Sequence, residues 1–374
     1  MEKRNTSAIF EAKRCELAVT LLLALGLVAA PLPANADPIR LTNFAGNDTR
    51  PTWDPRPGTD IIAYQTTNGG LSNAFSLGAV QADGTAERLL ATGPLTPFGI
   101  AAQHVSSWVG TTGRVMVNEA VVFHEYLSFQ PQASTFNRTV GDGNDAAFTQ
   151  ELLISGGGGG GFLLVSRDGQ DAVWRWSTSG GSGTQEVRTG PFASLVGQPA
   201  SATGTVIATL THPSTQFFLQ GAAIAPDGSK IILSEPSGAG WDLFMYNFDG
   251  SGRTQLTFSG GLSGAANFTP DFTPDGTRIA FALNGDIWAM NLDASGLLQL
   301  TDTPQQELWP TWAPDGERFA YGRYDTPASA AANWNIYADR VPTPPDPNVP
   351  EPAVLALVAT GMLGLALARR QQRR

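Results

Sequence analysis

Short apolar runs separated by turn-forming residues fill the chain between residues 37 and 340. Runs such as Ile61–Tyr64 and Ile231–Leu233 are bounded by Gly, Pro, Asp and Ser. Apolar runs of strand length between turn residues are typical of antiparallel β structure. The pattern therefore predicts an all-β fold for residues 37–340.

A repeat in the C-terminal half of this segment specifies the architecture. Pro-Asp-Gly occurs three times, each time before an apolar run, at Pro226, Asp227, Gly228, Pro274, Asp275, Gly276, Pro314, Asp315 and Gly316. Proline fixes φ, Asp can bond to the backbone ahead and Gly accepts positive φ, so each triplet predicts a tight hairpin. An Asp-x-Ser-Gly turn follows two of them, at 249–252 and 293–296, and predicts a second hairpin. Four short strands in each repeat of roughly 40–48 residues make one β-propeller blade.

The two ends of this segment complement each other. A weaker copy of the repeat occupies residues 51–90, and residues 38–43 before it match only the last strand of a repeat. The final repeat, which ends near Asp339, lacks that strand. We predict that residues 38–43 complete the last blade, which closes the ring and removes an exposed sheet edge.

The stretch between residues 95 and 220 repeats poorly. Residues 162–176 contain strands of one blade, and Val115–Val117 and Val121–Phe123 are predicted as two strands of another. The prediction is a propeller of six four-stranded blades, or seven if residues 196–220 form one more. Gly156–Gly161 is predicted to be a flexible loop.

These repeats resemble the WD-like propeller repeats of TolB-type proteins. The resemblance is strongest over residues 222–340, weaker over 38–92 and poor between them. It implies a β-propeller and identifies no catalytic residue.

The first 36 residues have the order of a secretory signal peptide. Basic residues precede the apolar run Leu17–Ala30, and Ala34 and Ala36 supply the small residues that a signal peptidase needs. The run is roughly 14 residues long, short of the ~20 that a membrane-spanning helix needs, so a membrane span is the weaker alternative. We predict cleavage after Ala36.

The C-terminus combines a linker, an apolar run and a basic end. Residues 341–352 are Pro-rich and end in the motif Val349, Pro350, Glu351 and Pro352. Residues 353–374 are apolar up to an arginine cluster that begins with Arg369 and Arg370. Arginines resist translocation, so this pattern predicts a short membrane helix with a cytoplasmic end. The apolar run of roughly 16 residues is marginal for a permanent anchor.

This arrangement resembles the PEP-CTERM sorting signal over residues 349–374. In that family an exosortase, a membrane cysteine transpeptidase, recognises the tripeptide and removes the tail. The family is typical of Gram-negative bacteria that make extracellular polysaccharide. The resemblance implies processing by exosortase after transient membrane anchoring. It also implies a location in the cell envelope, on the cell surface or in the extracellular matrix. An ordinary C-terminal anchor behind a Pro-rich stalk is the alternative.

Composition excludes several kinds of chemistry. The single cysteine, Cys15, lies in the leader, so residues 37–340 have no disulfide, thiolate nucleophile or cysteine metal ligand. The formal net charge is −10, and the basic residues are concentrated in the leader and the tail. An acidic body argues against a nucleic-acid partner.

The sequence shows no catalytic, cofactor or metal constellation. His104, His124 and His212 are widely separated, and no Gly-x-Ser-x-Gly motif occurs. The oxygen-rich segments 142–145 and 249–252 lack the six to eight ligands of a calcium loop, and we interpret them as turns.

The tryptophans recur at blade positions, so we predict that they pack between blades, with a sugar-stacking surface as the alternative. The tryptophans concerned are Trp53, Trp241, Trp288, Trp309, Trp312 and Trp334.

The connections on one face of the predicted propeller vary in length, whereas those on the other are tight turns. The variable segments are residues 65–72, 235–240, 259–267, 302–308 and 324–333. Because binding residues are often carried on loops over a rigid scaffold, we expect this face to hold the binding site. We predict a non-enzymatic module that binds a protein or an exopolysaccharide. The alternatives are a lyase or hydrolase that uses acidic residues in the channel, and a structural matrix component.

Overall fold

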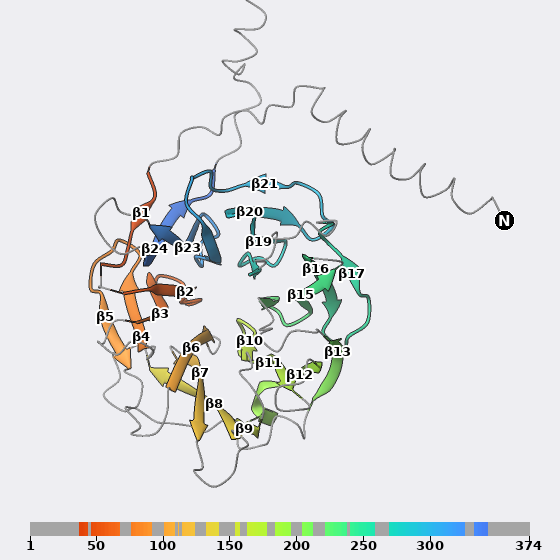
Figure 1. Cartoon of the computed structure of the whole chain (residues 1–374). Coiled ribbons are helices and arrows are strands. Elements are labelled where there is room, and N and C mark those ends of the chain that lie inside the picture. Colours follow the sequence, from red (N-terminus) through yellow and green to blue (C-terminus); the bar gives the residue numbers. More distant parts are fainter. Residues whose placement is uncertain are drawn as a thin grey trace, which may run out of the picture. The chain divides into compact units, whose positions relative to one another are not determined.

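The computed structural model describes most of the segment between the two chain ends (Figure 1), and Asp37–Val341 forms one compact unit. The described residues are 37–43, 46–67, 76–91, 101–108, 111, 114–123, 132–141, 154–157, 163–177, 184–195, 204–211, 221–237, 240–258, 269–325 and 333–342. The predicted signal peptide, the sorting motif and the C-terminal helix lie outside them. No helix among the described residues has the length and apolarity that crossing a membrane requires.

The described strands form six antiparallel four-stranded sheets around a common centre (Figure 1). The first contains β2 (Asp48–Trp53), β3 (Ile61–Thr66), β4 (Ser76–Gln81) and β5 (Arg88–Ala91). The second contains β6 (Ala101–Trp108), β7 (Arg114–Phe123), β8 (Gln132–Gly141) and β9 (Ile154–Gly157). The third contains β10 (Leu163–Val165), β11 (Asp171–Ser177), β12 (Thr184–Pro191) and β13 (Thr205–Thr211), with the 3-10 helix η1 (Phe192–Leu195) after β12.

The remaining sheets follow the same plan. The fourth contains β14 (Ala222–Ile224), β15 (Lys230–Ser237), β16 (Gly240–Asn247) and β17 (Thr254–Gln255). The fifth contains β18 (Asp271–Phe272), β19 (Arg278–Leu283), β20 (Asp286–Asn291) and β21 (Leu298–Gln299). The last contains β22 (Glu307–Trp312), β23 (Arg318–Asp325), β24 (Asn333–Arg340) and β1 (Ile39–Arg40). The prediction of an all-β propeller with four-stranded blades is confirmed.

The Pro-Asp-Gly triplets form the predicted hairpins between the first and second strands of their blades. At the central one, Asp275 Oδ1 accepts hydrogen bonds from the Thr277 N–H at 3.0 Å and from the Thr273 hydroxyl at 2.6 Å. Gly276 has φ +69°, which L side chains rarely adopt. The turn therefore uses all three residue types for the reasons that the sequence suggested.

The chain ends close the ring as predicted. β1 pairs antiparallel with β24, and the Leu41 N–H donates to the Ile336 carbonyl at 2.8 Å. The Ile336 N–H in turn donates to Thr42 Oγ1 at 3.0 Å. The Leu-Thr pairs that follow β17 and β21 make the same two bonds within their own blades. Residues 41–42 thus take the position in the last blade that the Leu-Thr pair after the fourth strand takes in the fourth and fifth blades.

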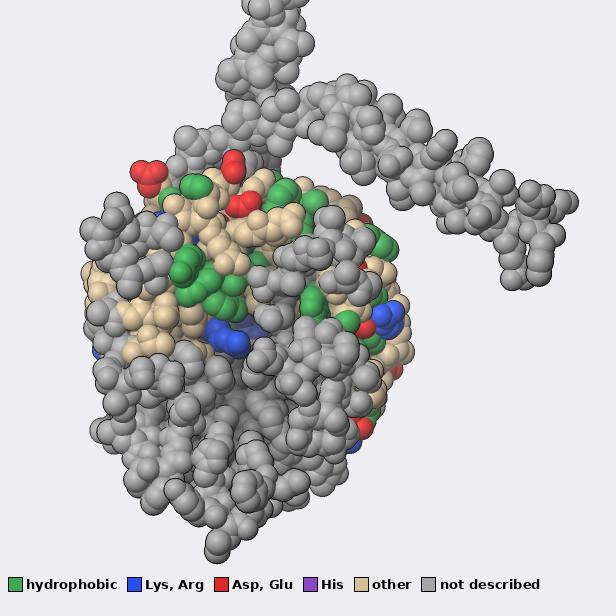
Figure 2. Space-filling view, in the orientation of Figure 1, with side chains coloured by type: hydrophobic (Ala, Val, Ile, Leu, Met, Phe, Trp, Pro, Cys, Tyr) green, Lys and Arg blue, Asp and Glu red, His purple; other side chains and the backbone are tan. Residues whose placement is uncertain are grey.

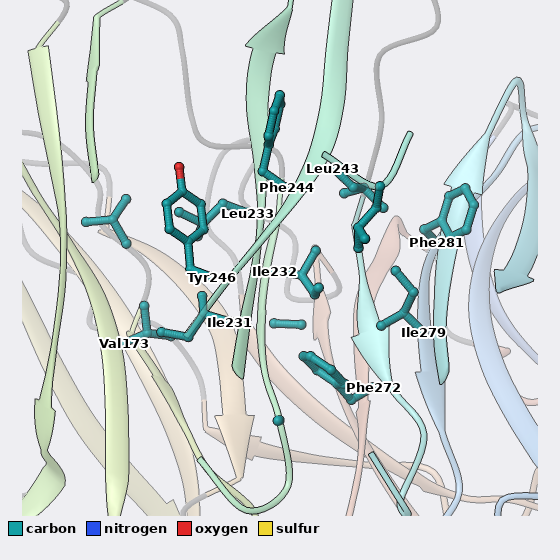
Figure 3. Close-up of a cluster of buried hydrophobic side chains, with 14 of the residues drawn as sticks. Val173, Ile231, Ile232, Leu233, Leu243, Phe244, Tyr246, Phe272, Ile279 and Phe281 are labelled. Carbon is teal, nitrogen blue, oxygen red and sulfur yellow. The ribbon is translucent and has the colours of Figure 1, made fainter. Parts of the chain in front are cut away.

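Apolar side chains fill the spaces between neighbouring sheets. In the largest cluster, Ile231, Leu233 and Phe244 lie with Val173 of the preceding sheet and Phe272 of the following one (Figure 3). A second cluster joins the last and first blades around Leu41, Trp53 and Ile336. Because each sheet buries both faces only against its neighbours, the closed ring is the unit that folds.

The middle of the chain differs from the sequence prediction in three details. Residues 115–117 and 121–123 belong to one strand, β7, and not to two. Residues 205–211 form β13, the fourth strand of the third sheet, and not a blade of their own. Gly156 and Gly157 end strand β9, so the glycine run is not entirely loop. This stretch lacks the Pro-Asp-Gly turns that set the register elsewhere, so its sequence does not show where one strand ends and the next begins.

Candidate binding site on the loop-rich face

The alternating strand directions define two faces of the propeller. The Pro-Asp-Gly and Asp-x-Ser-Gly turns lie on one face, which we call the tight-turn face. The second-to-third strand connections and the links between blades lie on the other, the loop-rich face. The first residues of β2 and β22 and the last residues of β3 and β23 therefore lie at the loop-rich face.

Two adjacent inner strands begin with the same unusual structure. β2 reads Asp-Thr-Arg-Pro-Thr-Trp and β22 reads Glu-Leu-Trp-Pro-Thr-Trp. Both change register in the middle of the strand. The third residue of each, Arg50 and Trp309, has a left-handed φ, +53° and +57°. A non-glycine residue in this conformation is strained by ~1 kcal/mol or more, and such strain is concentrated at functional sites. The shared Pro-Thr-Trp ending is visible in the sequence, whereas the left-handed conformation before it is not.

Hydrogen bonds between blades hold these strands in place. The Trp53 N–H donates to Thr311 Oγ1 at 3.1 Å, which joins the first blade to the last. The Trp309 N–H donates to Thr269 Oγ1 at 2.9 Å, and the Trp312 N–H donates to Asp271 Oδ2 at 2.9 Å. The positions of Arg50 and Trp309 are therefore fixed by the ring rather than by their own loops.

Arg50 is the most distinctive side chain of this region. It is exposed although it lies on an innermost strand, where the ring surrounds it. The surrounding protein removes part of its hydration, and this lowers the pKa of the guanidinium. Within the described part of the chain, Arg50 makes no ion pair and its side chain donates no hydrogen bond. Figure 2 shows basic side-chain atoms near the centre of the ring, beside hydrophobic ones.

A second arginine has a contrasting environment. Arg167 lies in the turn after β10, on the tight-turn face, where the carboxylates of Asp271 and Asp54 oppose its loss of charge. Loss of hydration nevertheless lowers the pKa of Arg167. Loss of hydration also raises the pKa of Asp271, to about 6, against the opposing effects of the Trp312 N–H and Arg167. Carboxylates of this protein thus oppose the loss of charge on Arg167, whereas Arg50 makes no ion pair among the described residues.

Two fully buried acids begin the same two strands. Burial raises the pKa of Asp48 to about 7 and that of Glu307 to about 7. The Thr303 hydroxyl donates to Glu307 Oε1 at 2.7 Å, and the hydroxyls of Thr42 and Thr66 lower the pKa of Asp48 in part. Each acid thus lies among groups of its own blade and of the preceding one, since Thr42 belongs to the last blade and Thr301, which also acts on Glu307, follows the fifth. The described residues contain no group of three or more His, Cys, Asp or Glu side chains that could hold a metal ion.

Aromatic rings accompany the left-handed turn of β22. The Trp309 and Trp334 ring centroids are 4.8 Å apart at 58°, and those of Trp334 and Tyr324 are 5.3 Å apart at 51°. All three side chains are half-buried, so each ring keeps part of its surface in solvent. The Trp334 N–H donates to Asn47 Oδ1 at 3.0 Å, which holds this group against the chain that enters β2.

The predicted packing role of the tryptophans is confirmed for Trp53, Trp241 and Trp312, which are buried. Trp288, Trp309 and Trp334 pack against core clusters but remain half-buried.

Other predicted positions are distributed as follows. The nine Pro-Asp-Gly residues lie on the tight-turn face. The turn interpretation of 249–252 is confirmed, since Asp249 Oδ1 accepts a hydrogen bond from the Ser251 N–H at 2.9 Å.

His104 lies in β6, whereas His124, His212 and residues 142–145 lie outside the described residues. Of the variable segments, Gln65 and Thr66 belong to β3, and residues 238–239 alone separate β15 from β16.

Segments of this chain match known proteins. Residues 348–374 match the PEP-CTERM protein-sorting motif. A segment of 108 residues, 26% of this chain, is 32% identical to the Tol-Pal system protein TolB of Anaeromyxobacter dehalogenans. The match covers 23% of that protein, so the chain spans about a quarter of the length of the curated relatives it matches.

Two solved structures are similar in fold. TolB from Acinetobacter baumannii has a TM-score of 0.47 and 16% identity, over 87% of this chain and 68% of that one. The calcium-binding protein regucalcin from Agrobacterium tumefaciens has a TM-score of 0.48 and 14% identity, over 83% and 96%.

The fold and the C-terminal motif define the class of protein as a β-propeller with a PEP-CTERM sorting signal. The motif implies processing by exosortase and export to the cell envelope of a Gram-negative bacterium. The propeller is similar to TolB over the matched segment.

Proposed function

We propose that this protein is a non-catalytic binding module, retained at the cell surface or in the extracellular matrix, that holds a protein or an exopolysaccharide on its loop-rich face. The C-terminal segment anchors it in the membrane until exosortase removes the tail. The observation that carries the proposal is Arg50, an exposed and partly dehydrated cation on an innermost strand, without an ion-pair partner among the described residues.

The energetics of Arg50 support a binding role. A guanidinium surrounded by protein is stabilised when an anion replaces its lost hydration. The backbone at Arg50 is strained, with φ +53°, and Arg50 makes no ion pair among the described residues. A few precisely placed polar groups beside aromatic surface are typical of ligand sites.

The arrangement of the acids favours binding over catalysis. General acid–base chemistry on a glycosidic bond needs two carboxyl groups that converge on one substrate atom. Asp48 and Glu307 are fully buried in separate blades, and Asp271 bonds to the backbone of β22.

The test is capture of ligand from an envelope and matrix extract of the producing bacterium by the purified protein. Bound protein and bound glycan are analysed separately, and soluble saccharide is sized before and after incubation. We expect specific retention of one component without shortening of saccharide. Release of shortened saccharide would show an enzyme, and retention of nothing above a bare matrix would refute a binding role.

A further inference from the structure

Three aromatic side chains of the last blade, which we call the aromatic group, lie together at the loop-rich face. They are Trp309 of β22, Tyr324 of β23 and Trp334 of β24. The ring of Trp334 contacts both of the others, with centroids 4.8 Å from Trp309 and 5.3 Å from Tyr324. The group lies on the side of the last blade that faces the first, where the Trp334 N–H bonds to Asn47. Three paired strands and the neighbouring blade therefore hold these rings in place.

Core packing does not account for the exposure of these rings. Tyr64 lies against Gly78, where a Cβ atom would overlap its ring, and Trp174 is seated against glycine in the same way. Both of these rings are buried, at 0% and 1% exposed. Trp309 is seated against Gly322, where a Cβ atom would lie 2.8 Å from the indole, yet Trp309 is only half-buried. The last blade thus fixes one side of this indole and leaves part of the ring to solvent.

Hydrogen-bond donors border the aromatic group. Asn47 is exposed, and its Oδ1 is used by the Trp334 N–H, but its amide N–H groups bond to no other described residue. The indole N–H groups of Trp309 and Trp334 also donate to no other group in the described part of the chain. An apolar partner would take water away from these donors without replacing its hydrogen bonds, whereas hydroxyl groups would accept from them.

The charged residues nearest to the aromatic group in sequence are directed away from it or buried. Arg323 and Asp325 flank Tyr324 in β23, so their side chains lie on the opposite side of the strand. They also pair with each other, at 2.9 Å. Asp48, which follows Asn47, is fully buried. These residues offer no charge to an ionic ligand, which favours a neutral one.

A neutral sugar ring matches both features of this surface. The C–H groups on the face of a pyranose carry partial positive charge and pack against the negative face of an aromatic ring. The hydroxyl groups at the edge of the same ring accept hydrogen bonds from amide and indole N–H groups. An apolar peptide side chain provides the first kind of contact without the second.

We propose that the aromatic group is a binding site for a neutral hexopyranose saccharide. Trp309 and Trp334 pack against the C–H face of a sugar ring, and Asn47 donates to its hydroxyl groups. This inference rests on the proposed function and specifies its ligand class.

The probes are cellotetraose, β-1,4-linked mannotetraose and sorbitol, an open-chain polyol that has hydroxyl groups but no ring face. Titration calorimetry on the purified full-length protein is expected to show binding of at least one tetrasaccharide and none of sorbitol at the same concentration. Trp309→Gly removes the indole and suits the left-handed backbone, with φ +57°, so it is expected to weaken that binding at least tenfold without unfolding the blade. Trp334→Ala is expected to weaken it at least tenfold as well.

Two variants serve as controls. Trp288→Ala removes another half-buried indole, which packs against the core cluster around Ile231 and Phe272. It is expected to lower the melting temperature at least as much as Trp309→Gly does, yet to bind saccharide like the wild type. Tyr324→Phe keeps the ring and loses the hydroxyl, and its affinity is expected to stay within twofold. Together these variants separate loss of the site from loss of stability.

Other outcomes overturn the inference. Unchanged binding by both Trp309→Gly and Trp334→Ala would place the saccharide elsewhere, and equal binding of sorbitol would remove the role of the ring face. A mannuronate tetrasaccharide that binds at least tenfold more tightly than mannotetraose would assign the site to acidic saccharides. Binding of neither neutral tetrasaccharide by a protein that still captures an envelope component would refute this site and leave the proposed function standing.

Discussion

Ring closure by residues 39–42 can be tested with a substitution that has matched controls inside the same molecule. Leu41, Leu256 and Leu300 occupy equivalent positions in three blades and are 0%, 3% and 2% exposed. Each donates its N–H to a third-strand carbonyl at 2.8 Å. Leu41 differs in one respect. It follows β1, which pairs with β24 but is not joined to it by a hairpin.

The expected cost follows from burial. Replacement of a fully buried leucine by alanine destabilises a protein by about 3 kcal/mol through lost transfer energy and the cavity that remains. For a unit of about 300 residues, an unfolding entropy of about 2 cal/mol/K per residue converts this into a fall in melting temperature of about 5 °C. If β1 is part of the cooperative ring, Leu41→Ala costs as much as Leu256→Ala or Leu300→Ala.

Thermal and guanidinium unfolding followed by tryptophan fluorescence provide the measurement. Ile39→Ala is the control on the same strand, and it is expected to change stability by less than about 0.5 kcal/mol because Ile39 is 53% exposed. A loss below about 1 kcal/mol at Leu41, with about 3 kcal/mol at Leu256 and Leu300, would show that β1 detaches before the ring unfolds. That result would refute closure as a source of stability.

Three further predictions follow from other features. Because the pKa of Asp48 is raised to about 7 by burial, the folded state holds its proton more tightly than the unfolded state. Its contribution to stability is therefore greatest below pH 4 and falls as pH rises toward 7, by at most about 1.4 kcal/mol per pH unit. Asp48→Asn should thus gain stability relative to wild type between pH 5 and pH 8 in denaturant titrations, and a constant difference would contradict this. Gly276→Ala should cost about 1 kcal/mol, since only its φ opposes a side chain. Gly228→Ala should cost more, because its Cβ would lie 2.3 Å from a carboxylate oxygen, and equal melting temperatures for the two variants would contradict this. Pro350→Ala with Pro352→Ala should leave the C-terminal tail on the envelope protein, and intact-mass spectrometry showing normal processing would refute recognition of the motif.

The parts of the fold that the sequence predicted are those fixed by local physics. Pro-Asp-Gly and Asp-x-Ser-Gly restrict φ and supply their own hydrogen bonds, so their hairpins could be located without tertiary information. The closure could be predicted because Leu41-Thr42 repeats the Leu-Thr pair of other blades and the last repeat lacks it. Both inferences required only residues that are close in sequence or aligned by repeat.

The candidate site could not be predicted in the same way. The left-handed conformations of Arg50 and Trp309 arise from bulges that only strand pairing reveals. The exposure of Arg50 depends on its place on an innermost strand, and the raised pKa of Asp48 depends on burial by two other strands. Such properties belong to the assembled ring, although the shared Pro-Thr-Trp ending was visible in the sequence.

The claim that the loop-rich face binds an envelope ligand is tested most directly by hydrogen–deuterium exchange on the purified protein, with and without the component it captures from the envelope extract. We predict slower exchange in residues 46–50, 307–309 and 333–335, which lie on the loop-rich face of the first and last blades. Protection confined to the turns at 226–229, 274–277 and 314–317 would place the ligand on the tight-turn face and contradict the claim.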